Sequence, residues 1–84
     1  MTYRVVVQKR VVKALEKIND PDYSKIKTAM FALASNPRPH GYKKLKGRSG
    51  FRIRAGNYRI IYEIFDNILL VDVIQLGDRK DIYD

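Results

Sequence analysis

The stretch FRIRAGNYRIIY, residues 51–62, decides the fold of this 84-residue chain. Two β-favouring segments flank the dipeptide Gly56-Asn57, which is typical of a two-residue hairpin turn. A turn at that point pairs Arg54 with Arg59. Since directly opposite residues point to the same face of a sheet, the pattern predicts a hairpin with one apolar face and one basic face.

The segments that follow this hairpin extend its apolar face. Asp66-Asn67 marks a second turn, between an expected strand at 58–65 and another at 68–76. Alternation along these strands places one apolar set on a single face, which we expect helices to cover. The set comprises Phe51, Ile53, Ile60, Tyr62, Ile64, Leu69, Val71 and Val73.

The N-terminal half supplies the helices that such a face needs. Thr2–Gln8 is short and β-rich and predicts a first strand. Apolar residues recur at helical spacing in residues 11–18, and again in 23–34 after the restart signal Asp20-Pro21. The order β-α-α-β-β-β predicts a single α+β domain, residues 1–84. Its two N-terminal helices are expected to pack on one face of a mainly antiparallel meander sheet.

The composition narrows the class of function. The chain carries a net charge of +8, has no Cys and has one His, His40. Disulfides and a catalytic thiolate are therefore excluded, and we expect neither a metal site nor another cofactor. No segment has the length of a membrane span or the pattern of a signal peptide. We expect a cytoplasmic protein with no membrane partner.

The positive charge is concentrated in one part of the chain. Residues 23–62 contain ten Lys or Arg residues and no Asp or Glu. A dense positive field of this kind favours a polyanionic partner, above all nucleic acid. Within it, the four cations of residues 43–48 are expected either to contact RNA backbone or only to keep a loop soluble. They are Lys43, Lys44, Lys46 and Arg48.

Three arginines share the basic face of the predicted hairpin. Arg54 and Arg59 are direct cross-strand neighbours, and Arg52 lies one diagonal away. Two readings remain open: an ordinary solvated sheet face, or a cradle for phosphate oxygens, which arginine forks bind in bidentate fashion. The absence of an acid near the turn favours the cradle.

Four motifs together resemble the RelE/ParE toxin superfamily, and its RelE branch in particular. They are KLKG at 44–47, FRIR at 51–54, GNYRIIY at 56–62 and GDRKDIY at 77–83. The resemblance implies a type II toxin that cleaves mRNA in the ribosomal A site, by attack of the 2′-hydroxyl and without a metal. It implies as partners the ribosome, mRNA and a cognate antitoxin whose acidic or helical peptide wraps the toxin. Operator DNA would be reached only through that antitoxin.

The same resemblance assigns expected roles to five residues. Arg52 and Arg54 fall where the family has two basic residues on the strand before the turn, and Arg59 is the Arg of the Gly-x-Tyr-Arg motif. Arg79 is the Arg after the last strand. Tyr83 matches the terminal Tyr that stacks on the substrate base. All five are expected to be catalytic.

The chain departs from the family pattern at the proposed general base. The RelE branch has a Lys where this chain has Arg54. Arginine is effectively never deprotonated, so it is a poor base. Either Arg54 only stabilises charge, or Tyr83 or a water takes the proton. Asp78, at a position often filled by His, either acts as a base or caps a turn.

Two other functions remain open at this point. One is a ParE-type toxin, which shares the fold but binds DNA gyrase. The other is a catalytically degenerate homologue that binds RNA or the ribosome without cutting. The terminal Tyr83 favours the RelE branch, whereas the missing base favours the degenerate alternative.

Overall fold

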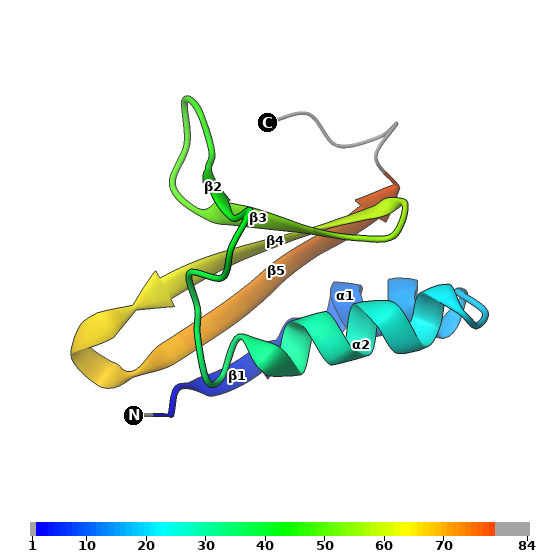
Figure 1. Cartoon of the computed structure of the whole chain (residues 1–84), viewed down its shortest axis with the longest axis horizontal. Helices are drawn as coiled ribbons and strands as arrows, with labels where there is room; N and C mark the ends of the chain where they lie inside the picture. Colours follow the sequence, from blue (N-terminus) through cyan, green and yellow to red (C-terminus); the bar gives the residue numbers. More distant parts are fainter. Residues whose placement is uncertain (1, 79–84) are drawn as a thin grey trace.

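Two helices cover one face of a five-stranded sheet in the computed structural model, which describes residues 2–78 (Figure 1). The strand order is β1-β5-β4-β3-β2. The α+β class and the two helices on one face are therefore confirmed. The elements are β1 (Arg4–Val7), α1 (Lys9–Glu16), α2 (Asp22–Ala32), β2 (Lys43–Lys44), β3 (Phe51–Ala55), β4 (Tyr58–Phe65), the 3-10 turn η1 (Asp66–Ile68) and β5 (Leu70–Asp78).

The β3–β4 hairpin has the register that its turn predicts. Arg54 lies opposite Arg59, and every other pair from Phe51–Tyr62 to the turn agrees. Gly56 has φ +61°. That left-handed conformation is the one a two-residue turn requires, and glycine adopts it without a Cβ penalty.

The second turn differs from the prediction. It is a four-residue connection in which η1 is followed by Leu69 at φ +51°, so β5 begins only at Leu70. Leu69 was expected on the apolar face, but it ends η1 and does not join the buried core. A bulge, with Ile61 opposite Gln75 but Tyr62 opposite Val73, then shifts the register.

Two pairings at the sheet edges extend the predicted three-stranded meander. β1 runs parallel to β5, with Val5 opposite Val71. At the other edge, β2 pairs antiparallel with β3, joining Lys43 to Arg52. β2 lies in a segment that has no strand pattern in the sequence. The sheet is therefore mixed, although three of its four pairings are antiparallel.

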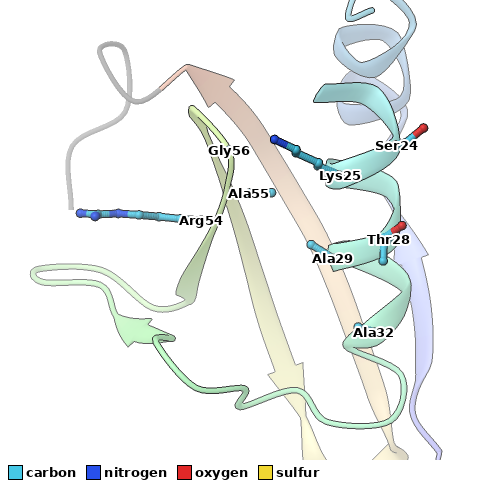
Figure 2. Close-up of a pocket in the computed structure, with 8 residues that line it drawn as sticks. All are labelled: Ser24, Lys25, Thr28, Ala29, Ala32, Arg54, Ala55 and Gly56. Carbon is cyan, nitrogen blue, oxygen red and sulfur yellow. The ribbon is translucent and has the colours of Figure 1, made fainter. Parts of the chain in front are cut away.

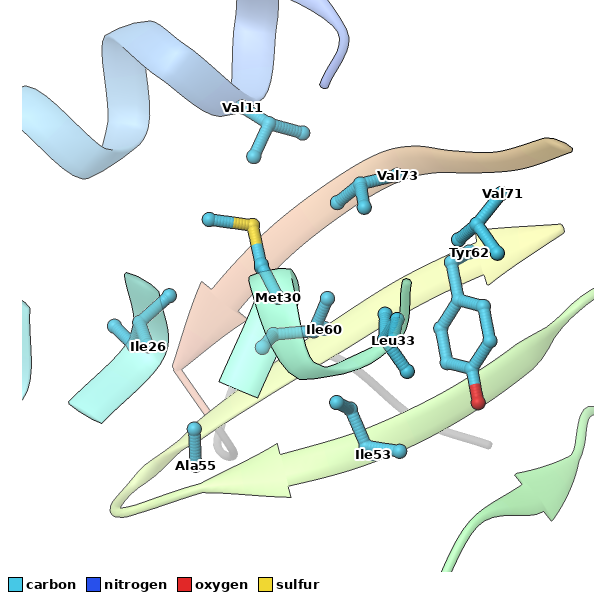
Figure 3. Packing of buried hydrophobic residues seen from close by; sticks show 10 residues of the cluster. All are labelled: Val11, Ile26, Met30, Leu33, Ile53, Ala55, Ile60, Tyr62, Val71 and Val73. Carbon is cyan, nitrogen blue, oxygen red and sulfur yellow. The ribbon is translucent and has the colours of Figure 1, made fainter. Parts of the chain in front are cut away.

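The main core lies between the helices and the sheet (Figure 3). Tyr62 and Ile60 of β4 are fully buried there. The helices contribute most of the apolar positions expected from their periodicity, but Val12 is 42% exposed and stays outside the core. The buried members are Val11, Ile26, Met30, Leu33, Ile53, Ala55, Ile60, Tyr62, Val71 and Val73.

The start of α2 is fixed by the predicted restart signal. The Asp20 carboxylate accepts hydrogen bonds from the Ser24 backbone N–H, at 3.0 Å, and from the Ser24 hydroxyl. These bonds hold the pKa of Asp20 below its usual value. Neither α1 nor α2 has the length and apolar character needed to cross a membrane, and the same holds for all helical structure within residues 2–78.

Candidate functional site

The face of the sheet opposite the helices carries a pair of arginines. We call this face the open face. Arg54 on β3 and Arg59 on β4 are directly opposite one another, and Gly77 of β5 continues their row. Arg54 is exposed and Arg59 is half-buried. Side chains at such positions lie about 5 Å apart at Cβ, so two guanidinium groups share one small area of surface.

Arg52 lies on the same face but has a different environment. It is only 3% exposed, although Arg54 two residues later is exposed. Lys43 of β2 is its cross-strand neighbour on the outer side. Because Arg52 is buried, it can act on a large ligand only by holding neighbouring protein groups in place. Arg54 is exposed and can reach the ligand itself.

A second, smaller core holds the basic segment, residues 43–48, against the open face. Leu45 is 5% exposed and packs with Ile61 and Ile74. Its backbone N–H donates to the Gly50 carbonyl at 3.0 Å. The expectation that Leu45 anchors this segment is therefore confirmed. The segment stands out from the sheet on the side away from the helices (Figure 1).

The four cations of the basic segment surround this buried leucine. Lys43 and Lys44 form β2, and Lys46 and Arg48 lie in the following loop. All four are exposed. They therefore form a projecting basic surface that is linked to the arginine pair through the β2–β3 ladder.

Two contacts fix the path of the chain from α2 to the basic segment. The buried Tyr62 hydroxyl donates to the Pro37 carbonyl at 2.7 Å. Arg38 forms an ion pair with Asp66 at 2.8 Å, and the Tyr3 hydroxyl donates to the same carboxylate at 2.6 Å. Burial raises the pKa of Tyr62 well above its usual value. Hydrogen bonds from Arg38 and Tyr3 lower the pKa of Asp66.

A groove of about 500 Å³ lies between α2 and the turn end of β3 (Figure 2). The Arg54 side chain points away from α2, so its guanidinium lies on the other side of β3 from the groove. Lys25 adds a cation on the helix side of the groove. It was not predicted as a site residue, although it lies within residues 23–62, which contain no Asp or Glu. The lining residues are Ser24, Lys25, Thr28, Ala29, Ala32, Arg54, Ala55 and Gly56.

The remaining predicted site residues fall at or beyond the end of the described chain. Asp78 is the last residue of β5, opposite Tyr58, whose side chain packs on the main core. Its register places Asp78 on the helix side of the sheet, away from the arginine pair, and in a strand instead of a turn. Arg79 and Tyr83 lie outside the described residues. Within residues 2–78, His, Asp and Glu side chains nowhere gather in threes as a metal site requires.

The arrangement can bind and polarise a phosphate. Two permanently charged forks on one side of the sheet offer donors to the non-bridging oxygens. Among residues 2–78, the nearest acids on the open face are Glu63 and Asp72, which lie opposite one another further along the strands. Asp72 accepts hydrogen bonds from Gln8 at 2.9 and 3.1 Å, and Glu63 accepts one from Ser49 at 3.4 Å.

Known proteins share both this sequence pattern and this fold. A family model described as the ParE toxin of the type II toxin–antitoxin system, parDE, matches residues 5–83. The mRNA interferase toxin RelE of Escherichia coli strain K12 is 25% identical to this chain, over 99% of this chain and 92% of its own length.

Solved structures agree with this match. A chain of the archaeal RelE–RelB complex from Pyrococcus horikoshii aligns with a TM-score of 0.85 and 31% identity, covering 98% of this chain and 100% of that one. A chain of the RelBE2 toxin–antitoxin complex of Mycobacterium tuberculosis, at 23% identity, shares the fold with a TM-score of 0.81 over 94% of this chain and 100% of its own. The family match extends over nearly the whole chain and the fold agrees with it, so this chain belongs to the RelE/ParE superfamily and is a RelE-like toxin of a type II toxin–antitoxin system.

Proposed function

We propose that this toxin is a ribosome-dependent endoribonuclease that cleaves mRNA in the ribosomal A site. The observation that carries the proposal is the pairing of Arg54 with Arg59 on the open face, beside a projecting basic surface. The similarity to the mRNA interferase toxin RelE of Escherichia coli supports it. The protein would act in the cytoplasm, where ribosomes and mRNA are found.

The proposed reaction is attack of a ribose 2′-hydroxyl on the adjacent phosphorus, with departure of the 5′-oxygen. Arg54 and Arg59 would bind the non-bridging oxygens and stabilise the extra negative charge of the phosphorane. Arg52, being buried, would position them. By family resemblance, Arg79 adds positive charge and Tyr83 stacks on a base, for roughly 1–3 kcal/mol. The reaction as proposed uses no metal.

The arginines do not act as the base in the proposed reaction. Arg54 cannot serve as the base, because its guanidinium stays protonated at any working pH. Tyr83 or a water on the ribosome would then take the 2′-hydroxyl proton. Arg54→Gln tests this assignment: if Arg54 only stabilises charge, cleavage slows but the shape of its pH dependence stays unchanged in the variant. Loss of an ionisation from the pH–rate profile would instead return the base to this position.

The basic segment would dock the toxin on the ribosome. Lys43, Lys44, Lys46 and Arg48 are exposed on one projecting element, which suits sequence-independent contacts to rRNA phosphates. A cognate antitoxin with acidic or helical segments would neutralise the toxin. Operator DNA would be bound only through that antitoxin.

Primer extension on translated mRNA tests the activity directly. Wild-type toxin is expected to produce breaks inside codons, and Arg59→Ala to reduce them about 100- to 1,000-fold, the usual effect of losing one charge-stabilising donor. Arg10→Ala is the matched control, because Arg10 is exposed on α1, in the helix layer. Full cleavage by Arg59→Ala would contradict the proposed mechanism.

A second candidate function is inhibition of DNA gyrase, which the match to the ParE toxin family supports. The two functions predict different results with the same purified protein. A gyrase inhibitor blocks supercoiling and leaves translated mRNA intact. An endoribonuclease does the reverse, and ribosome binding with neither effect would identify a degenerate toxin.

A further inference from the structure

The open face carries an apolar patch at the end opposite the arginine pair. Phe65 is 38% exposed, Val6 40% and Ile68 61%. Leu70, half-buried, pairs directly with Phe65. We call these four residues the turn-end patch, because Phe65, Ile68 and Leu70 lie at the β4–β5 connection and Val6 lies on β1, the neighbour of β5.

Strand alternation places three members of the turn-end patch on the open face. The neighbours of Val6, Phe65 and Leu70 along their strands pack into the main core on the helix side. Their own side chains therefore point the other way. Ile68 lies in η1, between Phe65 and Leu70 along the chain. The four side chains thus come from four elements, β1, β4, η1 and β5, at one end of the sheet.

The apolar side chains of the patch and the two carboxylates beside it make RNA a poor occupant. Glu63 and Asp72 border it, two residues along from Phe65 and Leu70 on the same face. A phosphate backbone laid over the patch would meet these two carboxylates, and apolar side chains offer it no donors. The patch is therefore functionally separate from the basic surface, roughly 20 Å from Arg59 at about 3.4 Å per residue along β4.

A second copy of the toxin is also a poor occupant. Each copy carries a net charge of +8, and Arg4 lies directly opposite Leu70 at the edge of the patch. A self-complementary contact would bring these charges together, and four side chains are too few for the area that a stable dimer buries. A polypeptide partner has neither difficulty if it places apolar side chains on the patch and its acidic residues on the basic parts of the toxin, away from Glu63 and Asp72.

We propose that the turn-end patch is a docking site for apolar side chains of the antitoxin. This inference rests on the proposed antitoxin partner and not on the nature of the toxic activity. Related toxins have been solved in complexes with antitoxins, including the Pyrococcus horikoshii RelE–RelB complex. Acidic antitoxin residues near Arg54 and Arg59 would then supply charge, and the patch would supply apolar anchoring.

The test separates neutralisation from toxicity. The double variant Phe65→Ser/Ile68→Ser changes two exposed patch residues and none of the proposed catalytic ones. It is expected to cut mRNA and arrest growth as wild type does. Its affinity for the cognate antitoxin, sought as the protein encoded by the reading frame adjoining the toxin gene, is expected to fall about thirtyfold or more by calorimetry. Co-expression of that protein would then no longer restore growth.

Phe31→Ser is the matched control. Phe31 is 56% exposed on α2, so the same aromatic is removed from the opposite layer. It is expected to be neutralised normally. Unchanged affinity in the Phe65→Ser/Ile68→Ser variant would overturn the proposal, as would loss of affinity in Phe31→Ser alone.

Photocrosslinking keeps the proposal testable if the double variant fails to fold. Replacing Phe65 by a photoreactive phenylalanine analogue retains an aromatic ring at that site. Irradiation of the toxin with the adjoining protein and with ribosomes is expected to link position 65 to the adjoining protein. A crosslink to rRNA or to a second toxin molecule would overturn the proposal. Primer extension on the same samples reports separately on the proposed nuclease activity.

Discussion

Tyr62→Phe removes one oxygen atom from the centre of the fold. In the wild type the fully buried Tyr62 hydroxyl donates to the Pro37 carbonyl at 2.7 Å. The phenylalanine ring fills the same space, so no large cavity forms. The carbonyl, however, loses this donor in a region that water does not reach. We expect a loss of about 1–2 kcal/mol of unfolding free energy, the usual cost of a buried polar group whose partner is removed.

Thermal and urea unfolding with circular dichroism measure this loss. For a domain of this size, about 1–2 kcal/mol corresponds to a fall of roughly 4–15 °C in Tm. Tyr3→Phe is the control, because the Tyr3 hydroxyl bonds to the exposed Asp66. Its effect on Tm is expected to be clearly smaller, since water can replace that bond. If Tyr62→Phe melted within about 1 °C of wild type, the buried hydrogen bond would not stabilise the fold as argued.

The same hydroxyl gives a pH signature. Burial raises the pKa of Tyr62 above its value in the unfolded chain. Above about pH 10 the unfolded chain loses this proton while the folded chain keeps it, so unfolding free energy falls as pH rises. Tyr62→Phe should flatten this alkaline slope. An unchanged slope in the variant would assign the effect to other groups.

Three further changes test other parts of the structure. Gly50→Ala, at φ +113° with a new Cβ 3.3 Å from a backbone oxygen, should destabilise more than Gly47→Ala, whose Cβ meets no atom within 4 Å; equal urea midpoints would refute this. Asp66→Asn removes the charge that pairs with Arg38. Folding lowers the pKa of Asp66, so in the wild type this carboxylate contributes to the loss of unfolding free energy as pH falls below about 4. The variant should lack that contribution. Leu45→Ala should cost about 2–3 kcal/mol in urea unfolding and also weaken ribosome binding in sedimentation assays, because it releases the basic segment; unaffected ribosome binding would separate the two roles.

The hairpin could be predicted from sequence because its determinants are local. Gly56-Asn57 fixes the turn, the turn fixes the register, and the register puts Arg54 beside Arg59. The prediction of the second turn was wrong because Asp66-Asn67 also suits a 3-10 turn. With η1 in its place, Leu69 takes a left-handed conformation that leucine seldom adopts.

Features set by contacts between distant segments could not be predicted. β2 is only Lys43-Lys44, and it forms because Leu45 finds a pocket against β4 and β5. Arg52 and Arg54 also differ in burial, although two arginines of the same strand and face look equivalent in a sequence. Only Arg52 pairs with β2.

The parallel pairing of β1 with β5 also governs when the protein can fold. It joins the first strand to the last, and Val11, Ile26 and Leu33 have no complete core until Val71 and Val73 are present. During synthesis, the N-terminal half therefore leaves the ribosome without a stable partner, and pairing between strands so far apart in the sequence slows folding further. A chain interrupted before β5 lacks the strand that joins β1 to β4, so we expect unfinished copies to form no stable sheet.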